Sequence, residues 1–554
     1  MFMNHNSQVF IPEVVAQAAR RVLAPRSFDE SGSEILADFI DETIIKMKSE
    51  HRDALLQQLG ACAVAVRTLG TMCSGTECPV LVQRAVRLAA LRHSVHFQFE
   101  HVFSCDKSET VQRFIKTVFA GHVKKLFRDT AEVASPSKRA PDLMTDGEES
   151  FVDTVLELIA GFPCTDVSSL RVGAKENREV IKDGAARAGG VFADILQYLG
   201  IHQKVESLLL ENVKGLGAKK AGQQYSNLDW CVALLESLGY WVFVMLLDPR
   251  ALGMPVSRNR YWIICIKLSV FTDAGISSEQ ATALAKELMQ DVVSGQPWRN
   301  LEDYLLPENH RAVRAVVERS PTKTKTRTKL PAWAEKYAAH LEGPPKDGQK
   351  APQQQRQQQP ASGRNWYDPV HPPAGILEAF PHLARLSDQH FTILAARGID
   401  VVSDEGMQNK GNKTIELSQT LGRTRPSNPG ECSVVLPGGK IYLEALGRCV
   451  VGHEALLLQG LHFGDGHAMI HEFSFEELQN LAGNAFNSYC CAASFLVKET
   501  LLGLARFGLR SVPGASSSIP RLECTAAMTE TQAAVAAWKK AKKPTLADVL
   551  VSPS

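Results

Sequence analysis

The sequence has no Cys-x-x-Cys pair among its 12 cysteines. Zinc modules and compact disulfide frameworks depend on closely spaced thiols, so the sequence predicts neither a metal site nor a disulfide framework. It also lacks the apolar run of about 18 residues that a membrane-spanning helix needs, and its first residues lack the basic segment and apolar core of a secretory signal. We therefore expect a soluble protein that is not secreted, has no membrane partner and keeps its thiols reduced inside the cell.

An excess of charge of one sign is also absent. The 61 lysines and arginines nearly balance the 60 aspartates and glutamates, which gives a formal net charge of +1. Any electropositive surface must therefore be local, as in the group formed by Lys214, Lys219 and Lys220. With 554 residues, of which 44% are hydrophobic and 22% charged, the chain has the composition of an ordinary soluble protein longer than one typical domain.

The chain divides into a helical extension, a strand-helix region, a region without that alternation, a second helical region and a flexible tail: residues 1–64, 65–267, 268–446, 447–510 and 511–554. Ser31 and Glu34 have the spacing of a capping box, which predicts a helix start. The alternation over 65–267 predicts an α/β fold, with a mostly parallel sheet covered by helices on both faces. The third region holds a basic stretch at 323–329 and a low-complexity insert at about 343–363 that we expect to be disordered.

Reactive side chains follow the apolar runs of the strand-helix region. One run leads into Phe-Pro-Cys at Cys164, and a thiol in a proline-stiffened loop after a strand is how an α/β sheet presents a nucleophile at its carboxyl edge. Another run ends at Glu211, and Arg258 and Arg260 lie between two further runs. Each residue alone has an ordinary alternative: an inert buried thiol, a helix-capping acid or a solvated strand edge. Together they place a thiol, a carboxylate and two guanidinium groups at successive element ends.

This ordered set resembles the DNA (cytosine-5) methyltransferase family. The resemblance rests on Gly-Phe-Pro-Cys, Glu-Asn-Val, Arg-x-Arg, a late Arg…Glu…Leu-Gln-Gly and Gly-Asn-Ala, found here at residues 161–164, 211–213, 258–260, 448–460 and 483–485. It covers most of residues 66–500. It implies a Rossmann-like, S-adenosylmethionine-dependent methyltransferase sheet, with a smaller target-recognition domain inserted at 268–446 between the two parts of the catalytic domain, 65–267 and 447–510.

The resemblance also implies the chemistry. Cys164 would attack carbon 6 of cytosine as a thiolate, which activates the poorly nucleophilic carbon 5. Arg258 and Arg260 would stabilise the thiolate and orient the base. Glu211 would share a proton with ring N3 as negative charge develops. In duplex DNA the cytosine must first be flipped out of the stack.

The cofactor residues implied by the resemblance are Ser74, Gly75, Thr76, Asp106, Asp129, Asn484 and Ala485. The first three lie in a glycine turn after a strand, where the family's first motif carries adenosylmethionine. Asp106 would bind the ribose, although a helix N-cap is its alternative. Asp129 suits the acid that contacts the adenine amino group. Asn484, whose alternative is a turn between helices, and Ala485 would reach the cofactor from the far end of the sequence.

Some positions depart from the family pattern. Cys73 and Glu77 replace a phenylalanine and a second glycine, Ser104 stands where the family has its ribose acid, and Val256 replaces a glutamine. Thr-Asp-Val-Ser at 165–168 is closest to the de novo type of eukaryotic enzyme. We therefore predict a nuclear DNA (cytosine-5) methyltransferase acting on duplex DNA. Two alternatives stay open, an RNA cytosine-5 methyltransferase and a catalytically weak DNA-binding regulatory paralogue, as does the oligomeric state.

Overall fold

The computed structural model describes residues 9–10, 32–62, 65–168, 179–184, 186–219, 223–318, 374–401, 403, 406–407, 410–419, 424–463 and 467–508. The basic stretch at 323–329, the low-complexity insert at 343–363 and the tail at 511–554 lie outside these residues. Within the described part, no helix is both long and apolar enough to cross a bilayer.

The strands of the larger sheet are β1 (Val9–Phe10), β2 (Arg67–Met72), β3 (Phe99–Cys105), β4 (Lys125–Phe127), β5 (Arg139–Asp142), β6 (Glu148–Phe151), β7 (Glu157–Ala160), β8 (Ser207–Val213), β9 (Tyr240–Leu247) and β10 (Arg260–Lys267). This sheet is ten-stranded, in the order β1-β9-β10-β8-β7-β2-β3-β4-β5-β6. The central strands β8, β7, β2, β3 and β4 are parallel, and β10 is antiparallel to both of its neighbours. The predicted α/β class, with its mostly parallel sheet, is confirmed.

The strand order reverses between β2 and β7. From β2 the chain passes to β3 and then β4 on one side, and it later returns to β7 and then β8 on the other side. The loops that leave the carboxyl ends of β2 and β7 therefore diverge to opposite faces. Such a switch point is where open α/β sheets bind their ligands.

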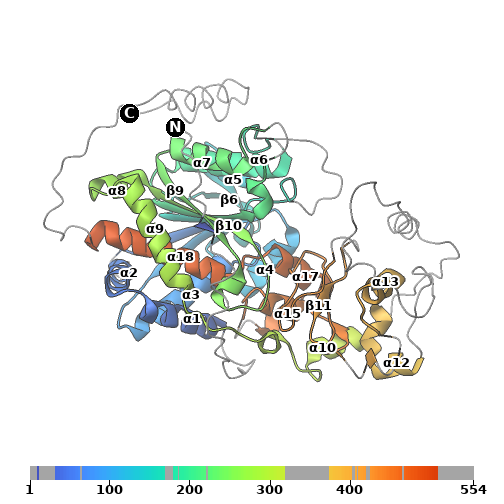
Figure 1. Ribbon diagram of the computed structural model, residues 1–554. Coiled ribbons are helices and arrows are strands. Elements are labelled where there is room, and N and C mark those ends of the chain that lie inside the picture. Colours follow the sequence, from blue (N-terminus) through green and yellow to red (C-terminus); the bar gives the residue numbers. More distant parts are fainter. Residues whose placement is uncertain are drawn as a thin grey trace, which may run out of the picture.

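Helices cover both faces of the sheet, as the alternation predicts (Figure 1). One face is covered by α1 (Gly32–Lys46), α2 (Ser49–Ala61), α3 (Cys78–Arg92), α4 (Glu109–Val118), α8 (Leu268–Asp273), α9 (Ser278–Val293) and α18 (Ser488–Gly503). The other is covered by α5 (Thr130–Val133), α6 (Ala186–Ile201) and α7 (Asn227–Ser237). Strand β10 shows why one sheet builds two cores: Trp262 and Ile264 join the first, whereas Ile263 and Cys265 join the second.

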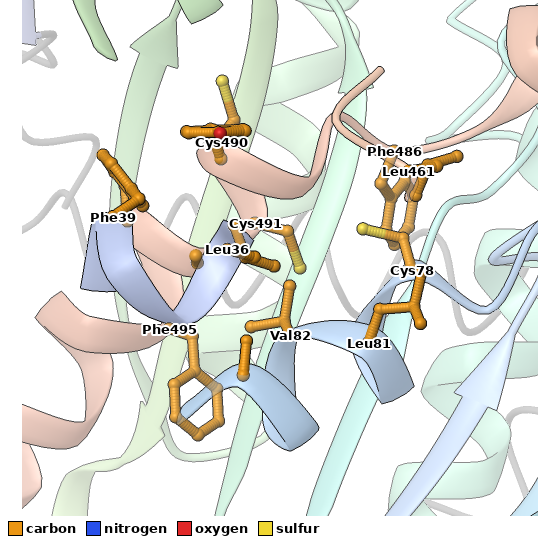
Figure 2. Packing of buried hydrophobic residues seen from close by; sticks show 14 of the residues in the cluster. Leu36, Phe39, Cys78, Leu81, Val82, Leu461, Phe486, Cys490, Cys491 and Phe495 are labelled. Atoms are coloured by element: carbon orange, nitrogen blue, oxygen red, sulfur yellow. The ribbon is translucent and has the colours of Figure 1, made fainter. Parts of the chain in front are cut away.

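The late helix α18 lies at the centre of the first core. Figure 2 shows its Cys491 and Phe495 among side chains of α1 and α3, including Phe39 and Val82. The helix begins at Ser488, because Asn487 caps it by accepting a bond from Cys490 N at 3.2 Å. The segment after residue 447 thus returns to the larger sheet and packs on the amino-terminal helices. The preceding helix α17 (Phe475–Asn484) starts at a capping box formed by Ser474 and Glu477.

A smaller sheet is formed by β11 (Thr414–Glu416), β12 (Ile441–Leu443) and β13 (Arg448–Cys449). It lies with α10 (Arg311–Glu318), α12 (Ala374–Ala379), α13 (Asp388–Ala396) and α15 (Gly452–Leu457) on the right of Figure 1. The short helix α16 (His467–Ile470) contacts α4. A separate small core, with Leu394 and Ile415 among its members, joins this sheet to α12 and α13. Helices α8 and α9 pack with the larger sheet, although they lie after the predicted boundary at residue 268.

The late Arg…Glu motif, Arg448 and Glu454, forms a buried ion pair with a structural role. The guanidinium of Arg448 makes two bonds to the carboxylate of Glu454, at 2.7 and 2.8 Å. Glu454 also accepts from the backbone N–H groups of Leu306 and Val451, both at 2.8 Å. A bidentate, fully satisfied pair of this kind fixes geometry, here the start of α15 against the segment around residue 306.

Candidate active site

Cys164 lies in the loop that leaves the carboxyl end of β7. A side chain on Gly161 would collide with the Phe486 ring, 2.4 Å from its Cβ, and with the Cys73 carbonyl oxygen at 2.9 Å, so glycine is required there. The Cys164 carbonyl accepts from Val167 N at 3.1 Å and from the next N–H at 2.9 Å, which closes a turn. The thiol is half-buried, accessible from the edge of the sheet yet held by an ordered loop.

Glu211 lies on the neighbouring strand β8, opposite Trp262 of β10. Its carboxylate is 9% exposed, and its Oε1 lies 3.0 Å from Nε of Arg260. The next residue ties the two strand ends together, since Asn212 Nδ2 donates to the Phe162 carbonyl at 2.9 Å. The sequence motif included this asparagine without a role. The structure assigns it to holding the thiol loop beside Glu211.

Electrostatics link these groups. Burial raises the pKa of Cys164, and the Glu211 carboxylate raises it further. The charges of Arg260 and Arg258 oppose this rise in the Cys164 pKa without cancelling it. Burial also raises the pKa of Glu211, against the pull of both arginines. The free protein therefore favours a neutral thiol beside a carboxyl group that takes up a proton more readily than an exposed one.

Arg258 and Arg260 occupy different positions. Arg258 is 4% exposed and donates to backbone carbonyls of Val435 (3.2 Å), Gly483 (3.2 Å) and Ala485 (2.7 Å). Burial and the charge of Arg260 lower the pKa of Arg258 to about 9. Both were predicted to serve the base. In the structure, the hydrogen bonds of Arg258 hold the segments around Val435 and residues 483–485 together beside the site. Arg260 instead lies against the Glu211 carboxylate.

Asp248, which sequence reasoning missed, organises the loop that carries both arginines. It lies directly after β9 and accepts from Asn259 Nδ2 at 2.8 Å, Ser257 Oγ at 3.2 Å and Arg250 Nη2 at 3.1 Å. The sequence does carry a signal for Asp248: like Glu211, it is an acid at the end of an apolar run, and a proline follows it. These bonds fix the approach of the chain to Arg260.

The expected cofactor loop connects β2 to α3 at the switch point. Cys73, Gly75 and Glu77 all have positive φ angles, of 53°, 70° and 51°. A Cβ on Gly75 would lie 3.3 Å from the Asn484 carbonyl oxygen and 3.8 Å from Ala485 Cα. The structure thus brings together Gly75, Asn484 and Ala485, which the sequence separates by about four hundred positions.

The two predicted acids follow the next strands. Asp106 comes after β3 and accepts from Ser108 N at 2.9 Å; burial raises its pKa to about 6, although the N–H groups of Ser108 and Gly75 pull it down. The N-cap of α4 is Ser108, so the alternative of an N-cap at position 106 is wrong. Asp129 comes after β4. Partial burial alone would raise the pKa of Asp129, but the bonds from Lys107 (2.8 Å) and Ala131 N (3.2 Å) lower it.

Ser74 and Thr76 face the interior. Ser74 is 1% exposed, and its Oγ donates to Glu77 at 2.7 Å. Thr76 is fully buried, and its Oγ1 has no hydrogen-bond partner within the described residues. Any contact from Ser74 to a cofactor would therefore come from its backbone.

These residues fit S-adenosylmethionine. Carboxylates after β3 and β4 suit ribose hydroxyls and an adenine amino group. Glycine at position 75 has a positive φ angle and lets Asn484 pack closely against this turn, because a side chain there would press on the Asn484 carbonyl oxygen.

Comparisons with known proteins agree with this geometry. The family model for C-5 cytosine-specific DNA methylase matches residues 91–419, more than half of the chain. The DNA (cytosine-5-)-methyltransferase DMT5 of Cryptococcus neoformans is 26% identical over 456 residues, covering 78% of this chain and 17% of the relative. Its namesake from Verticillium dahliae is 23% identical over 487 residues (77% and 19%). The type II methyltransferase M.BsuFI of Bacillus subtilis is 32% identical over 155 residues (27% and 34%).

The chain spans less than a fifth of the length of the two fungal relatives. The matched region of the family model contains the thiol loop, the Glu211 strand end and the paired arginines, all at one edge of one sheet. The chain belongs to the C-5 cytosine-specific DNA methylase family.

Proposed function

We propose that this chain transfers a methyl group from S-adenosylmethionine to carbon 5 of cytosine in duplex DNA, within the nucleus. The observation that carries the proposal is the meeting of three features at the carboxyl edge of the sheet: the half-buried Cys164, the Glu211–Arg260 ion pair at 3.0 Å, and the glycine turn at the β2–β7 switch point. Family membership and the eukaryotic relatives support both substrate and location.

The residues divide the work as follows. Cys164 gives its proton to solvent, and the thiolate sulfur then forms a bond to carbon 6 of the flipped-out base. Glu211, whose pKa burial raises, gives a proton or a hydrogen bond to ring N3 as carbon 5 gains electron density. Arg260 holds Glu211 in place. S-adenosylmethionine, when bound, supplies the methyl group. Solvent then takes the proton from carbon 5, Glu211 takes back any proton given to ring N3, and expulsion of the Cys164 sulfur restores the aromatic ring.

A substrate panel tests the proposal. Purified protein is incubated with methyl-tritiated S-adenosylmethionine and unmethylated duplex DNA, hemimethylated duplex DNA or tRNA, and the products are hydrolysed to nucleosides. We expect label in 5-methyldeoxycytidine. Label in RNA alone would replace DNA by RNA as substrate. Cofactor binding without label in any nucleic acid would favour the regulatory paralogue.

Replacing Glu211 by glutamine should lower the rate of methyl transfer by about 100-fold, the low end for loss of a general acid. The amide keeps the size of the side chain and can still lie against Arg260, but it has no acidic proton for ring N3. Single-turnover methylation at saturating DNA and S-adenosylmethionine measures the effect. Glu148→Gln, at an exposed position on the far strand β6, is the matched control and should leave the rate unchanged. An E211Q rate within twofold of wild type would remove Glu211 from the chemistry.

A further inference from the structure

The carboxyl group of Glu77 is buried beneath the cofactor loop. Glu77 is the N-cap residue of α3 and is 1% exposed. The Oγ1 of Thr71, on β2, lies 3.0 and 2.9 Å from its two carboxyl oxygens, and Ser74 Oγ lies 2.7 Å from Oε1. Its side chain therefore binds both the end of strand β2 and the loop that follows, on the side away from solvent.

Hydroxyl and imidazole groups complete the cluster. Thr71 Oγ1 also lies 3.1 Å from His101 Nε2 and 3.2 Å from Ser104 Oγ, both on β3. Thr71 has one hydroxyl hydrogen and four polar atoms within hydrogen-bond distance. A proton on the Glu77 carboxyl supplies a further donor to this crowded group. The hydroxyl groups of Thr71 and Ser74 donate to the carboxyl oxygens and by themselves lower the Glu77 pKa, so these bonds fix the position of the side chain.

Burial and the charges around Glu77 favour the protonated carboxyl. The titratable groups that face it are His101 on β3, Asp106 after β3 and Cys78 on α3. Burial lowers the pKa of His101 to about 3, so this imidazole is neutral. Within the described residues no lysine or arginine forms an ion pair with Glu77. Burial, helped by the charge of Asp106, raises the pKa of Glu77 to about 7 against the bonds from Ser74, Thr71 and Ser104.

The cluster is joined directly to the loop expected to hold S-adenosylmethionine. Three of the five residues at 73–77 have positive φ angles, and two of these three, Cys73 and Glu77, are not glycine. Such residues hold this conformation only where their surroundings enforce it. The hydrogen bond from Ser74 to Glu77 closes the loop on itself, and Gly75, between them in the sequence, lies against Asn484.

We propose that Glu77 is a positioning residue for S-adenosylmethionine: its protonated carboxyl, bound to Thr71 and Ser74, holds the loop at 73–77 in the binding conformation, and loss of that proton weakens cofactor affinity. The inference rests on the proposed function, since it concerns the same site. It gives a reason why Glu77 and Ser104, two departures from the family pattern, occur together. They are members of one cluster.

Calorimetric titration with S-adenosylmethionine at pH 7.0 and pH 8.5 tests the inference. The dissociation constant of the wild type should rise about tenfold across this range as Glu77 ionises, whereas that of Glu77→Gln, a neutral isostere, should change much less. Asp106, with a pKa near 6, is already ionised throughout. The ratio of wild-type to variant constants cancels any ionisation of the ligand itself.

Two further variants sharpen the test. Glu109→Gln removes a nearby exposed carboxylate at the start of α4 and should keep the wild-type pH dependence. Glu77→Ala removes both hydrogen bonds and should bind more weakly than Glu77→Gln at both pH values. The inference is overturned by equal pH dependence in wild type and E77Q, or by wild-type affinity in E77A. Failure of every form, wild type included, to bind S-adenosylmethionine would overturn the proposed function as well.

Discussion

Replacing Cys164 by alanine is expected to abolish the covalent adduct with DNA that contains 5-fluorocytosine. Fluorine at carbon 5 cannot leave as a proton does, so a methylated base stays bonded to the attacking sulfur and the complex survives a denaturing gel. Wild-type protein should give a shifted band in the presence of S-adenosylmethionine, and the variant none. Turnover on ordinary cytosine should fall by at least about 10⁴-fold, as is usual when a nucleophile is removed.

The control for this experiment is a cysteine of similar exposure elsewhere. Cys449, on β13 of the smaller sheet, is also half-buried, and Cys449→Ser should form the adduct as the wild type does. Binding of unmodified DNA by C164A, measured by anisotropy, separates loss of chemistry from loss of folding. An adduct of normal yield in C164A would assign the nucleophile to another residue.

The sequence predicted the edge of the sheet well, because strand ends are local features. The apolar runs before Cys164 and Glu211 became β7 and β8, which are parallel neighbours, so their carboxyl ends had to meet. The capping-box spacing of Ser31 and Glu34 likewise predicted a helix start, and α1 begins at Gly32. In each case the information lies within about ten consecutive residues.

The contacts of Arg258 were not predictable in this way. Its acceptors, the carbonyls of Val435, Gly483 and Ala485, lie 177 to 227 positions later, and a carbonyl acceptor leaves no mark on residue type. The contacts within the Glu77 cluster could not be predicted from the sequence either. Glu77 and Ser104 each stood out as a departure, but only the pairing of β2 with β3 places Thr71 opposite Ser104.

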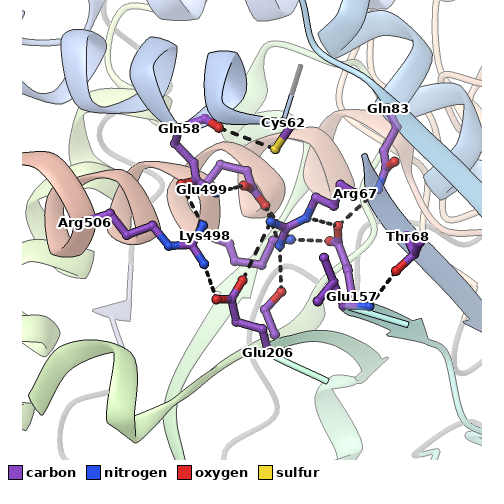
Figure 3. Close-up of polar contacts among 12 residues, drawn as sticks. Gln58, Cys62, Arg67, Thr68, Gln83, Glu157, Glu206, Lys498, Glu499 and Arg506 are labelled. Atoms are coloured by element: carbon purple, nitrogen blue, oxygen red, sulfur yellow. Dashed lines mark hydrogen bonds and ion pairs between the residues drawn. The ribbon is translucent and has the colours of Figure 1, made fainter. Parts of the chain in front are cut away.

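The second large effect is expected at the opposite edge of the sheet, where a charge network is buried (Figure 3). Arg67 at the start of β2 pairs with Glu157 at 2.9 Å and with Glu499 at 3.1 Å. Lys498 pairs with the same two carboxylates, at 2.7 Å to Glu499 and closely to Glu157. The four side chains are nearly or fully buried, and their charges balance.

Lys498→Met should lower the free energy of unfolding by about 3–5 kcal/mol, because it leaves two buried carboxylates to share one guanidinium. Methionine keeps most of the length and apolar stem of lysine, so packing changes little. Urea denaturation followed by circular dichroism measures the loss as a shift of the midpoint at constant slope.

The double variant Lys498→Met with Glu157→Gln decides whether charge is the cause. It restores balance, with Arg67 facing Glu499 and, at 4.0 Å, Glu206, and should recover at least half of the lost stability. A double variant no more stable than the single one would instead attribute the loss to packing of the lysine stem.

The dependence of the free energy of unfolding on pH provides an independent check of the same network. Burial alone would raise the pKa of Glu499, but Arg67 and Lys498 lower it to about 2, below its value in the unfolded chain. The stability that this ion pairing contributes is therefore complete above about pH 4.5 and is lost as the pH falls toward 2. In Lys498→Met one of the two cations is gone, so the pKa of Glu499 rises toward its unfolded value and the stability falls less steeply over that range. A wild-type chain as stable at pH 3 as at pH 6 would mean that the network contributes nothing to the folded state that the unfolded chain lacks.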